Sequence, residues 1–147
     1  MNERYLEKLQ NRLKGGDGTH SVAKDVALEK SEQLNKIADK GAVVVINVAS
    51  DFSPNIRWRD NYEYSGKVFR NILLKQYDVA ISTSKILLVN FNGTKGVPIS
   101  FHQEAFAETI AAKLVDDTFD FFERIFIKRD DWHDKVVEVY EEMLKVM

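Results

Sequence analysis

Basic side chains surround the start of one predicted helix. Arg57, Arg59, Lys67 and Arg70 lie on either side of Ser65-Gly66. Free backbone N–H groups and the helix dipole at such a start favour bound negative charge. One interpretation is therefore a site for an anion or a nucleotide, formed by Arg57, Arg59, Ser65, Gly66 and Arg70. In the other interpretation, Arg57 and Arg70 form ion pairs with nearby acidic residues and hold this loop in place.

A glycine-containing turn at residues 92–100 precedes another predicted helix. Gly93 and Gly96 allow the chain to turn sharply, and Pro98 stiffens the exit from the turn. Ser100 and Gln103 have the Ser-x-x-Gln spacing of a capping box, so we expect them to bond reciprocally at the helix start. Further along this helix, three apolar residues are expected to face a sheet: Phe101, Ala105 and Phe106.

The histidines do not have the spacing of a metal site. His20, His102 and His133 are scattered, and the chain has no cysteine. His102 is close to Ser100, but no Gly-x-Ser-x-Gly elbow surrounds that serine. We therefore predict a protein that is not an enzyme and that uses neither a metal nor another cofactor.

Three apolar runs must form the sheet that positions these residues. Runs rich in β-branched and aromatic residues predict strands at 42–48, 85–91 and 124–128. The first run is almost continuously apolar, which is typical of a strand covered on both faces. Because helical patterns alternate with the strands, we predict an α/β fold with a mainly parallel sheet.

Helices are predicted between the strands and at both ends of the chain. The first forty residues have apolar side chains at helical spacing, and Gly41 is the expected C-terminal cap. Later helices are expected from Ser65-Gly66, from Ser100 to residue 114, and after a cap at Asp130 or Asp131. The pair Asp116-Asp117 is typical of a turn or cap. We divide the chain into a helical extension, 1–40, and an α/β domain, 41–147.

The helical extension has an alternative interpretation as a DNA-binding element. Residues 21–27 and 31–40 have the lengths of two helices in a reduced helix-turn-helix. Acidic residues offset the lysines of this segment, however, which disfavours contact with phosphates. We favour a helix that covers the sheet or forms an oligomer.

Composition limits the classes of partner. The 147 residues are enough for one core, and the 21 basic and 23 acidic side chains leave a formal charge of −2. This balance gives no global field that would attract nucleic acid or anionic lipid. We see no membrane-spanning segment, and the absence of cysteine fits a reducing compartment, so we expect a cytoplasmic protein.

Several short motifs together form one recognisable pattern. They are Asp51-Phe52-Ser53, Arg57, Tyr64-Ser65-Gly66, Phe69-Arg70, Asn92-Gly93, Gly96, Ser100-Phe101 and Glu104-Ala105-Phe106. On these motifs, residues 42–146 resemble the bacterial STAS-like domains of unknown function. Those domains are distant relatives of the sulfate-transporter and anti-sigma-factor-antagonist domains.

This resemblance implies a βαβαβα sandwich and a regulatory module that docks a partner protein. It places the partner contacts at Gly96, Ser100, Phe101, Gln103 and Glu104, and the partner would be an ATPase or kinase of the histidine-kinase-like superfamily. It also implies that Ser100 is a phosphorylation site, where about two added negative charges would switch docking off. A phage or mobile-element protein that inhibits or completes a larger assembly would use the same docking chemistry.

Overall fold

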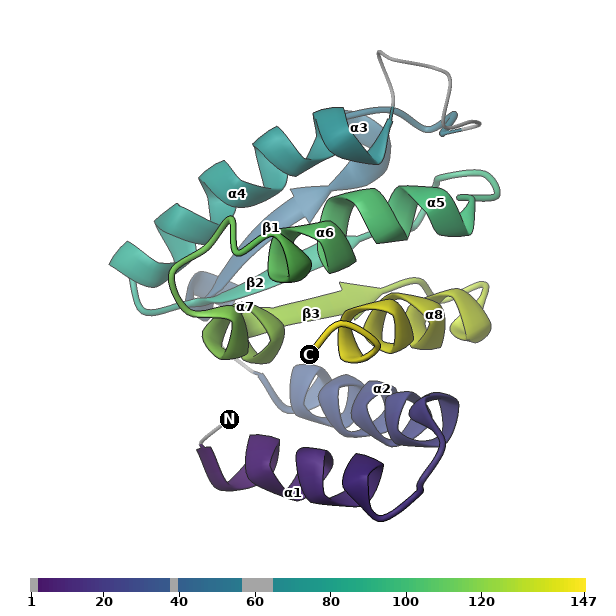
Figure 1. Ribbon diagram of the computed structural model, residues 1–147. Helices are drawn as coiled ribbons and strands as arrows, with labels where there is room; N and C mark the ends of the chain where they lie inside the picture. Colours follow the sequence, from purple (N-terminus) through teal and green to yellow (C-terminus); the bar gives the residue numbers. More distant parts are fainter. Residues whose placement is uncertain (1–2, 38–39, 57–64) are drawn as a thin grey trace.

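The computed structural model describes residues 3–37, 40–56 and 65–147 (Figure 1). The strands are β1 (Val43–Asn47), β2 (Ile86–Asn90) and β3 (Ile125–Lys128). The helices are α1 (Glu3–Lys14), α2 (Thr19–Lys36), α3 (Val48–Asp51), α4 (Gly66–Ser82), α5 (Ile99–His102), α6 (Glu108–Ala111), α7 (Thr118–Arg124) and α8 (His133–Leu144). A π-helical segment, Gln103–Ala107, joins α5 to α6, and a 3-10 turn, Lys40–Ala42, precedes β1. None of the described helices has the length and apolar character that a bilayer crossing requires.

The described strands form one parallel sheet in the order β1-β2-β3. This confirms the predicted α/β class, and each strand falls within its predicted run. The first strand is shorter than expected because Val48 already begins α3.

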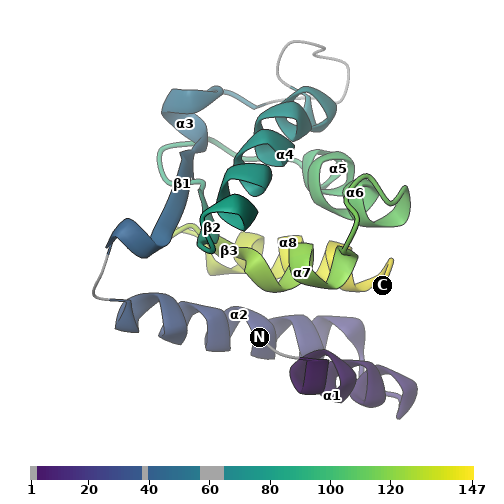
Figure 2. The ribbon, with the colours of Figure 1, turned by 90° about the vertical axis from the view of Figure 1, so that its left-hand side faces the viewer.

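One face of the sheet forms the core. Ile46, Val89 and Ile127 lie side by side in the strand register, and each is at most 7% exposed. Figure 2 shows α4 to α8 on this side of the sheet. The expected helix from Ser100 to residue 114 is confirmed as far as Ala111. Its residues Phe101, Ala105 and Phe106 are all buried, as predicted.

The opposite face of the sheet is partly bare. Val45 is 43% exposed, and its neighbour across the ladder, Leu88, is only half-buried. Phe126, the next residue in this row, is buried because Lys30 of α2 lies over its ring. The prediction that the first strand is covered on both faces is therefore wrong: β1 is an edge strand with one open face.

The N-terminal helices pack beyond the β3 edge of the sheet (Figures 1 and 2). α2 is one continuous helix through residues 28–30, which rules out a turn between two short helices there. It ends at Lys36, and Gly41 lies in the 3-10 turn, so the predicted glycine cap is also wrong. Val22 and Val26 of α2 are fully buried in the same hydrophobic core as the sheet.

Lys30 anchors α2 to the sheet. The residue is 3% exposed, and its amine donates to the backbone oxygens of Phe122, at 2.6 Å, and Ile125. The rings of Phe122, Phe126 and Tyr140 surround it at about 5 Å. Burial lowers the pKa of this amine well below its ordinary value.

The helices around β3 begin differently from the prediction. The sequence pattern did not reveal α7, but Asp117 caps it by accepting a bond from the Asp120 amide at 2.9 Å. α8 has Trp132 at its cap position and no side-chain cap, so the predicted cap at Asp130 or Asp131 is wrong. Asp130 instead accepts a bond from the Asn92 side chain, and Asp131 pairs with Arg129.

Candidate functional site

The turn at 92–100 leaves the carboxyl end of β2 and is held by hydrogen bonds within the turn and from Arg129. Gly93 has a positive φ of 87°, which favours glycine. The Thr94 hydroxyl donates to the Phe91 carbonyl at 2.6 Å, and Arg129 donates to the Thr94 carbonyl at 3.0 Å. Both Thr94 and Arg129 are 6% exposed. The turn is therefore a fixed part of the fold.

Ser100 does not form the predicted capping box. Pro98 holds the extended cap position, and Ser100 already lies within the first turn of α5, where no side chain caps the helix. Gln103 is turned away to α8, where its amide donates to Glu142 Oε1 at 2.7 Å. Ser100 stays half-buried in this first turn.

Phe101 lies in an aromatic cluster beneath the surface. Its ring centroid is 5.3 Å from Phe69 and 6.3 Å from Phe91, and the side chain is 2% exposed. It therefore offers a partner almost no surface, and supports the helix start from below.

The two predicted sites meet at one helix junction. The Glu104 carboxylate accepts a bond from the Lys67 amide at 3.3 Å, and Arg70 donates to the Glu104 carbonyl at 3.0 Å. Ser65 caps α4 as predicted, by accepting from the Val68 amide at 3.2 Å. A Cβ atom at Gly66 would collide with the backbone of α5, so glycine permits this close approach. The start of α4 is thus already supplied with a negative charge by Glu104.

Between its described residues, this junction encloses no space for a separate anion. The hollow between Ser65, Gly66, Ser100 and Glu104 has no cavity large enough for a water molecule. Arg57 and Arg59 lie outside the described residues. Of the predicted anion-binding set, Ser65, Gly66 and Arg70 therefore join α4 to the helix that follows the turn.

His102 is buried beside this junction. It is 1% exposed, and neither ring nitrogen is hydrogen-bonded to a described residue. Burial, together with the charges of Lys135 and Arg129, lowers its pKa to about 3. Glu138 lies 3.5 Å from Nε2 and favours the charged form, but full burial among phenylalanine rings outweighs it. His102 is therefore neutral and has no access to a substrate in solvent.

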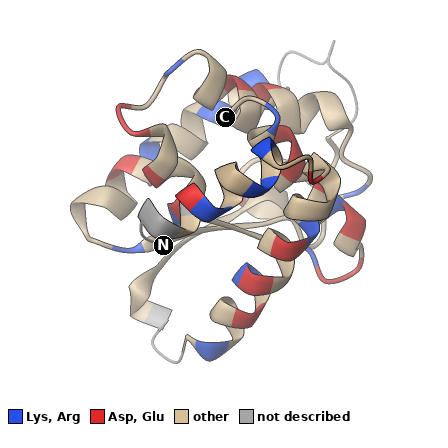
Figure 3. Cartoon of the chain, turned by 60° about the horizontal axis from the view of Figure 1, so that its bottom comes forward, with Lys and Arg blue, Asp and Glu red and all other residues tan. Residues whose placement is uncertain are grey.

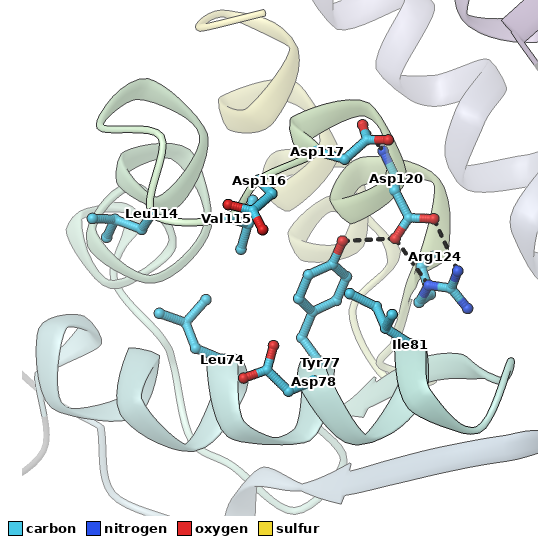
Figure 4. Close-up of a pocket in the computed structure, with 10 residues that line it drawn as sticks. All are labelled: Leu74, Tyr77, Asp78, Ile81, Leu114, Val115, Asp116, Asp117, Asp120 and Arg124. Carbon is cyan, nitrogen blue, oxygen red and sulfur yellow. Dashed lines mark hydrogen bonds and ion pairs between the residues drawn. The ribbon is translucent and has the colours of Figure 1, made fainter.

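Sequence reasoning missed a groove at the other end of the sheet (Figure 4). This groove, of about 500 Å³, lies between α4, residues 114–117 and α7. Its lining includes Tyr77, Asp120 and Arg124, which are joined by hydrogen bonds. The only sequence signal for the groove was the pair Asp116-Asp117. This signal is not specific, because acidic residues are common in turns. A further aspartate of the lining, Asp78, lies on another helix and far away in the sequence.

Charges on the rest of the molecule are mixed. Figure 3 shows acidic and basic residues interspersed along the helices, in agreement with the net charge of −2. In the described part of the chain, no group of three His, Cys, Asp or Glu side chains is placed to hold a metal ion.

No protein-family model, curated protein or solved structure matches this chain. The resemblance to STAS-like domains therefore stays a prediction.

Proposed function

We propose that this protein is a non-catalytic regulatory module, STAS-like in type, that binds a partner protein through the surface after β2. The surface, here called the docking ridge, consists of Lys95, Gly96, Ile99, Ser100 and Gln103. Gly96, Ser100 and Gln103 belong to the partner contacts that the resemblance implies. The other two implied contacts, Phe101 and Glu104, support the ridge from within the fold.

One observation carries the proposal: Ile99 is 43% exposed at the tip of a rigidly held helix start. The buried Phe101 cluster and the Glu104 contact with α4 hold that helix from beneath. Next to Ile99, Gly96 has no atom within 4 Å of its Cβ position, so a partner backbone can approach closely. A preformed surface of this kind loses little conformational entropy on binding.

A non-catalytic role agrees with the chemistry of the titratable groups. Among the described residues, the basic groups with strongly lowered pKa values, Lys30 and His102, are both buried, and neither lines the groove. The resemblance supplies the class of partner, an ATPase or kinase of the histidine-kinase-like superfamily.

Phosphorylation of Ser100 would regulate the docking ridge. Ser100 lies in the first turn of a helical stretch, where the helix dipole stabilises a phosphate. The added charge, about −2, would lie beside Ile99 and oppose an apolar contact. Mass spectrometry of the native protein tests this. If Ser100 carries no phosphate under any growth condition, the modification is excluded.

Affinity purification with matched variants tests the docking proposal. Ile99→Asp should abolish retention of the specific partner, because it places a charge at the centre of the docking ridge. Leu28→Asp is the control, since Leu28 is also exposed, at 58%, but lies on α2. Circular dichroism must show that both variants are folded. Equal retention of the same partner by both variants would contradict the proposal.

The rival interpretation, anion sensing, makes a different prediction. Because Glu104 occupies the α4 start, inorganic phosphate should not raise the melting temperature of the protein. A concentration-dependent increase would favour the anion site instead.

A further inference from the structure

The groove lies at the opposite end of the sheet from the docking ridge. Along the chain, α4 precedes β2 and α7 precedes β3, so the C-terminal ends of both helices lie near the amino ends of these strands. The groove is therefore next to the amino ends of β2 and β3. In Figure 4, Leu74, Tyr77, Asp78 and Ile81 extend from α4 on one side of it. Leu114, Val115 and Asp116 lie on the other side, and Asp120 and Arg124 close one end.

A polar network keeps this end of the groove in shape. The Tyr77 hydroxyl donates to Asp120 Oδ2 at 2.6 Å, and Arg124 donates to both oxygens of the same carboxylate, at 3.0 and 2.9 Å. Arg124 also donates to the Lys85 carbonyl at 2.7 Å. Although its partial burial opposes this, hydrogen bonds from Arg124 and Tyr77 lower the pKa of Asp120. The groove is therefore formed before any partner binds.

The network neutralises only one of the four carboxylates in the lining. Asp120 is paired with Arg124, the only basic residue of the lining. No ion pair links Asp78, Asp116 or Asp117 to a basic residue in the part of the chain that the structure describes. With four carboxylates and one guanidinium, the lining carries a net charge of −3 at pH 7.

Apolar side chains flank these carboxylates. Ile81 is 44% exposed and Leu114 is 45% exposed, one on each side of the groove, with Leu74 and Val115 half-buried between them. Exposed leucine and isoleucine beside unpaired carboxylates suit a long basic side chain, because its alkyl stem covers apolar surface while its charged head reaches the acids. A bare metal ion would leave the apolar flanks uncovered.

We propose that the groove is a second docking site, which receives an arginine or lysine side chain from a basic segment of another protein. The basic head lies against Asp78, Asp116 and Asp117, and apolar neighbours in the same segment cover Ile81 and Leu114. This site is separate from the docking ridge, so each can fail without affecting the other.

A pair of short peptides tests the proposal on the whole chain. The probe is acetyl-Leu-Arg-Leu-amide, and its control has citrulline in place of arginine, which has nearly the same shape but no charge. In ¹⁵N–¹H NMR spectra, the arginine peptide should shift the amides of residues 78, 81 and 114–117. The citrulline peptide should bind at least about tenfold more weakly, as expected for the loss of partly exposed ion pairs.

Charge-matched variants separate a specific groove from a general field effect. The triple variant Asp78→Asn, Asp116→Asn, Asp117→Asn should weaken binding of the arginine peptide by about tenfold. Asparagine at 117 keeps the cap on α7. A control that removes three charges elsewhere, Glu7→Gln, Glu32→Gln, Asp134→Asn, should bind the peptide with nearly unchanged affinity.

Three results of the peptide experiments would overturn the proposal. They are shifts that avoid the groove, equal binding of the arginine and citrulline peptides, and an equal loss of affinity in the two triple variants. A titration with free spermidine gives a fourth: if spermidine shifts the groove amides and the arginine peptide does not, the occupant is a small polyamine and not a protein segment.

Discussion

The two ends of the sheet differ in how their polar groups are satisfied. At the carboxyl end, the start of α4 already holds the Glu104 carboxylate, and Phe101 fills the space beneath the turn. At the amino end, three aspartates line an open groove without a described basic partner. The carboxyl end, which carries most of the sequence motifs, is thus filled by its own side chains and exposes only the docking ridge. The amino end carries few motifs but has an open groove.

Truncating one apolar residue at each end tests this difference most strongly. Phe101→Ala should lower the free energy of unfolding by about 4 kcal/mol, because a fully buried ring is removed from an aromatic cluster. Leu114→Ala should cost less than about 1 kcal/mol, since the side chain is already 45% exposed. Urea denaturation measures both. Similar losses would show that the groove is packed as tightly as the turn.

A second comparison uses two glycines. Gly66→Ala should destabilise the fold by about 2 kcal/mol, because the new methyl group collides with the α5 backbone and separates the two helices. Gly96→Ala should change stability by less than about 0.5 kcal/mol, since open space surrounds its Cβ position. If Gly66→Ala is neutral, α4 and α5 do not approach as closely as described.

The neutral histidine of the carboxyl end predicts an acid sensitivity. The folded pKa of His102, about 3, lies below its unfolded value of 6.5, so between these values the unfolded state binds more protons. The contribution of His102 to the free energy of unfolding is therefore constant above pH 6.5 and falls as the pH decreases below that value. At pH 5 the loss should be about 2 kcal/mol.

His102→Phe is the control for this pH dependence. It removes the titrating group but keeps an aromatic ring, so its unfolding free energy should fall less between pH 7 and pH 5. The quantity to compare is the change between the two pH values, because the substitution also alters packing. The same decrease in both proteins would show that His102 does not titrate as described.

The smallest expected difference concerns one carboxylate at each end. Glu104→Gln should lower stability by about 0.5 kcal/mol, because it removes a negative charge from the start of α4. Asp116→Asn should leave stability unchanged or raise it slightly, since it relieves repulsion among the groove carboxylates. Chemical denaturation at low ionic strength gives the clearest readout. A gain of stability in Glu104→Gln together with a loss in Asp116→Asn would contradict the comparison.

Local signals in the sequence were sufficient for the strands and for one helix start. The β-branched runs predicted all three described strands, and Ser65 caps α4 as its residue type suggested. These signals depend on neighbouring residues and on the alternation of side chains, which the sequence displays directly.

Features that depend on distant residues could not be predicted. Ser100 has the spacing of a capping residue, but Pro98 takes the cap position and Gln103 bonds to α8. The valines of β1 suggested two covered faces, because hydrophobicity alone does not reveal that a strand lies at an edge. The groove joins Asp78 to Asp116, and only the packing of α4 against the later helices brings them together.

Photo-crosslinking in the native cell tests the central claim, docking through the ridge, most directly. Benzoylphenylalanine replaces Ile99 in one protein and Leu28 in another, both at exposed positions. We predict one discrete crosslinked product from position 99 and none of that size from position 28. No product at position 99, or the same product from both positions, would contradict the docking ridge.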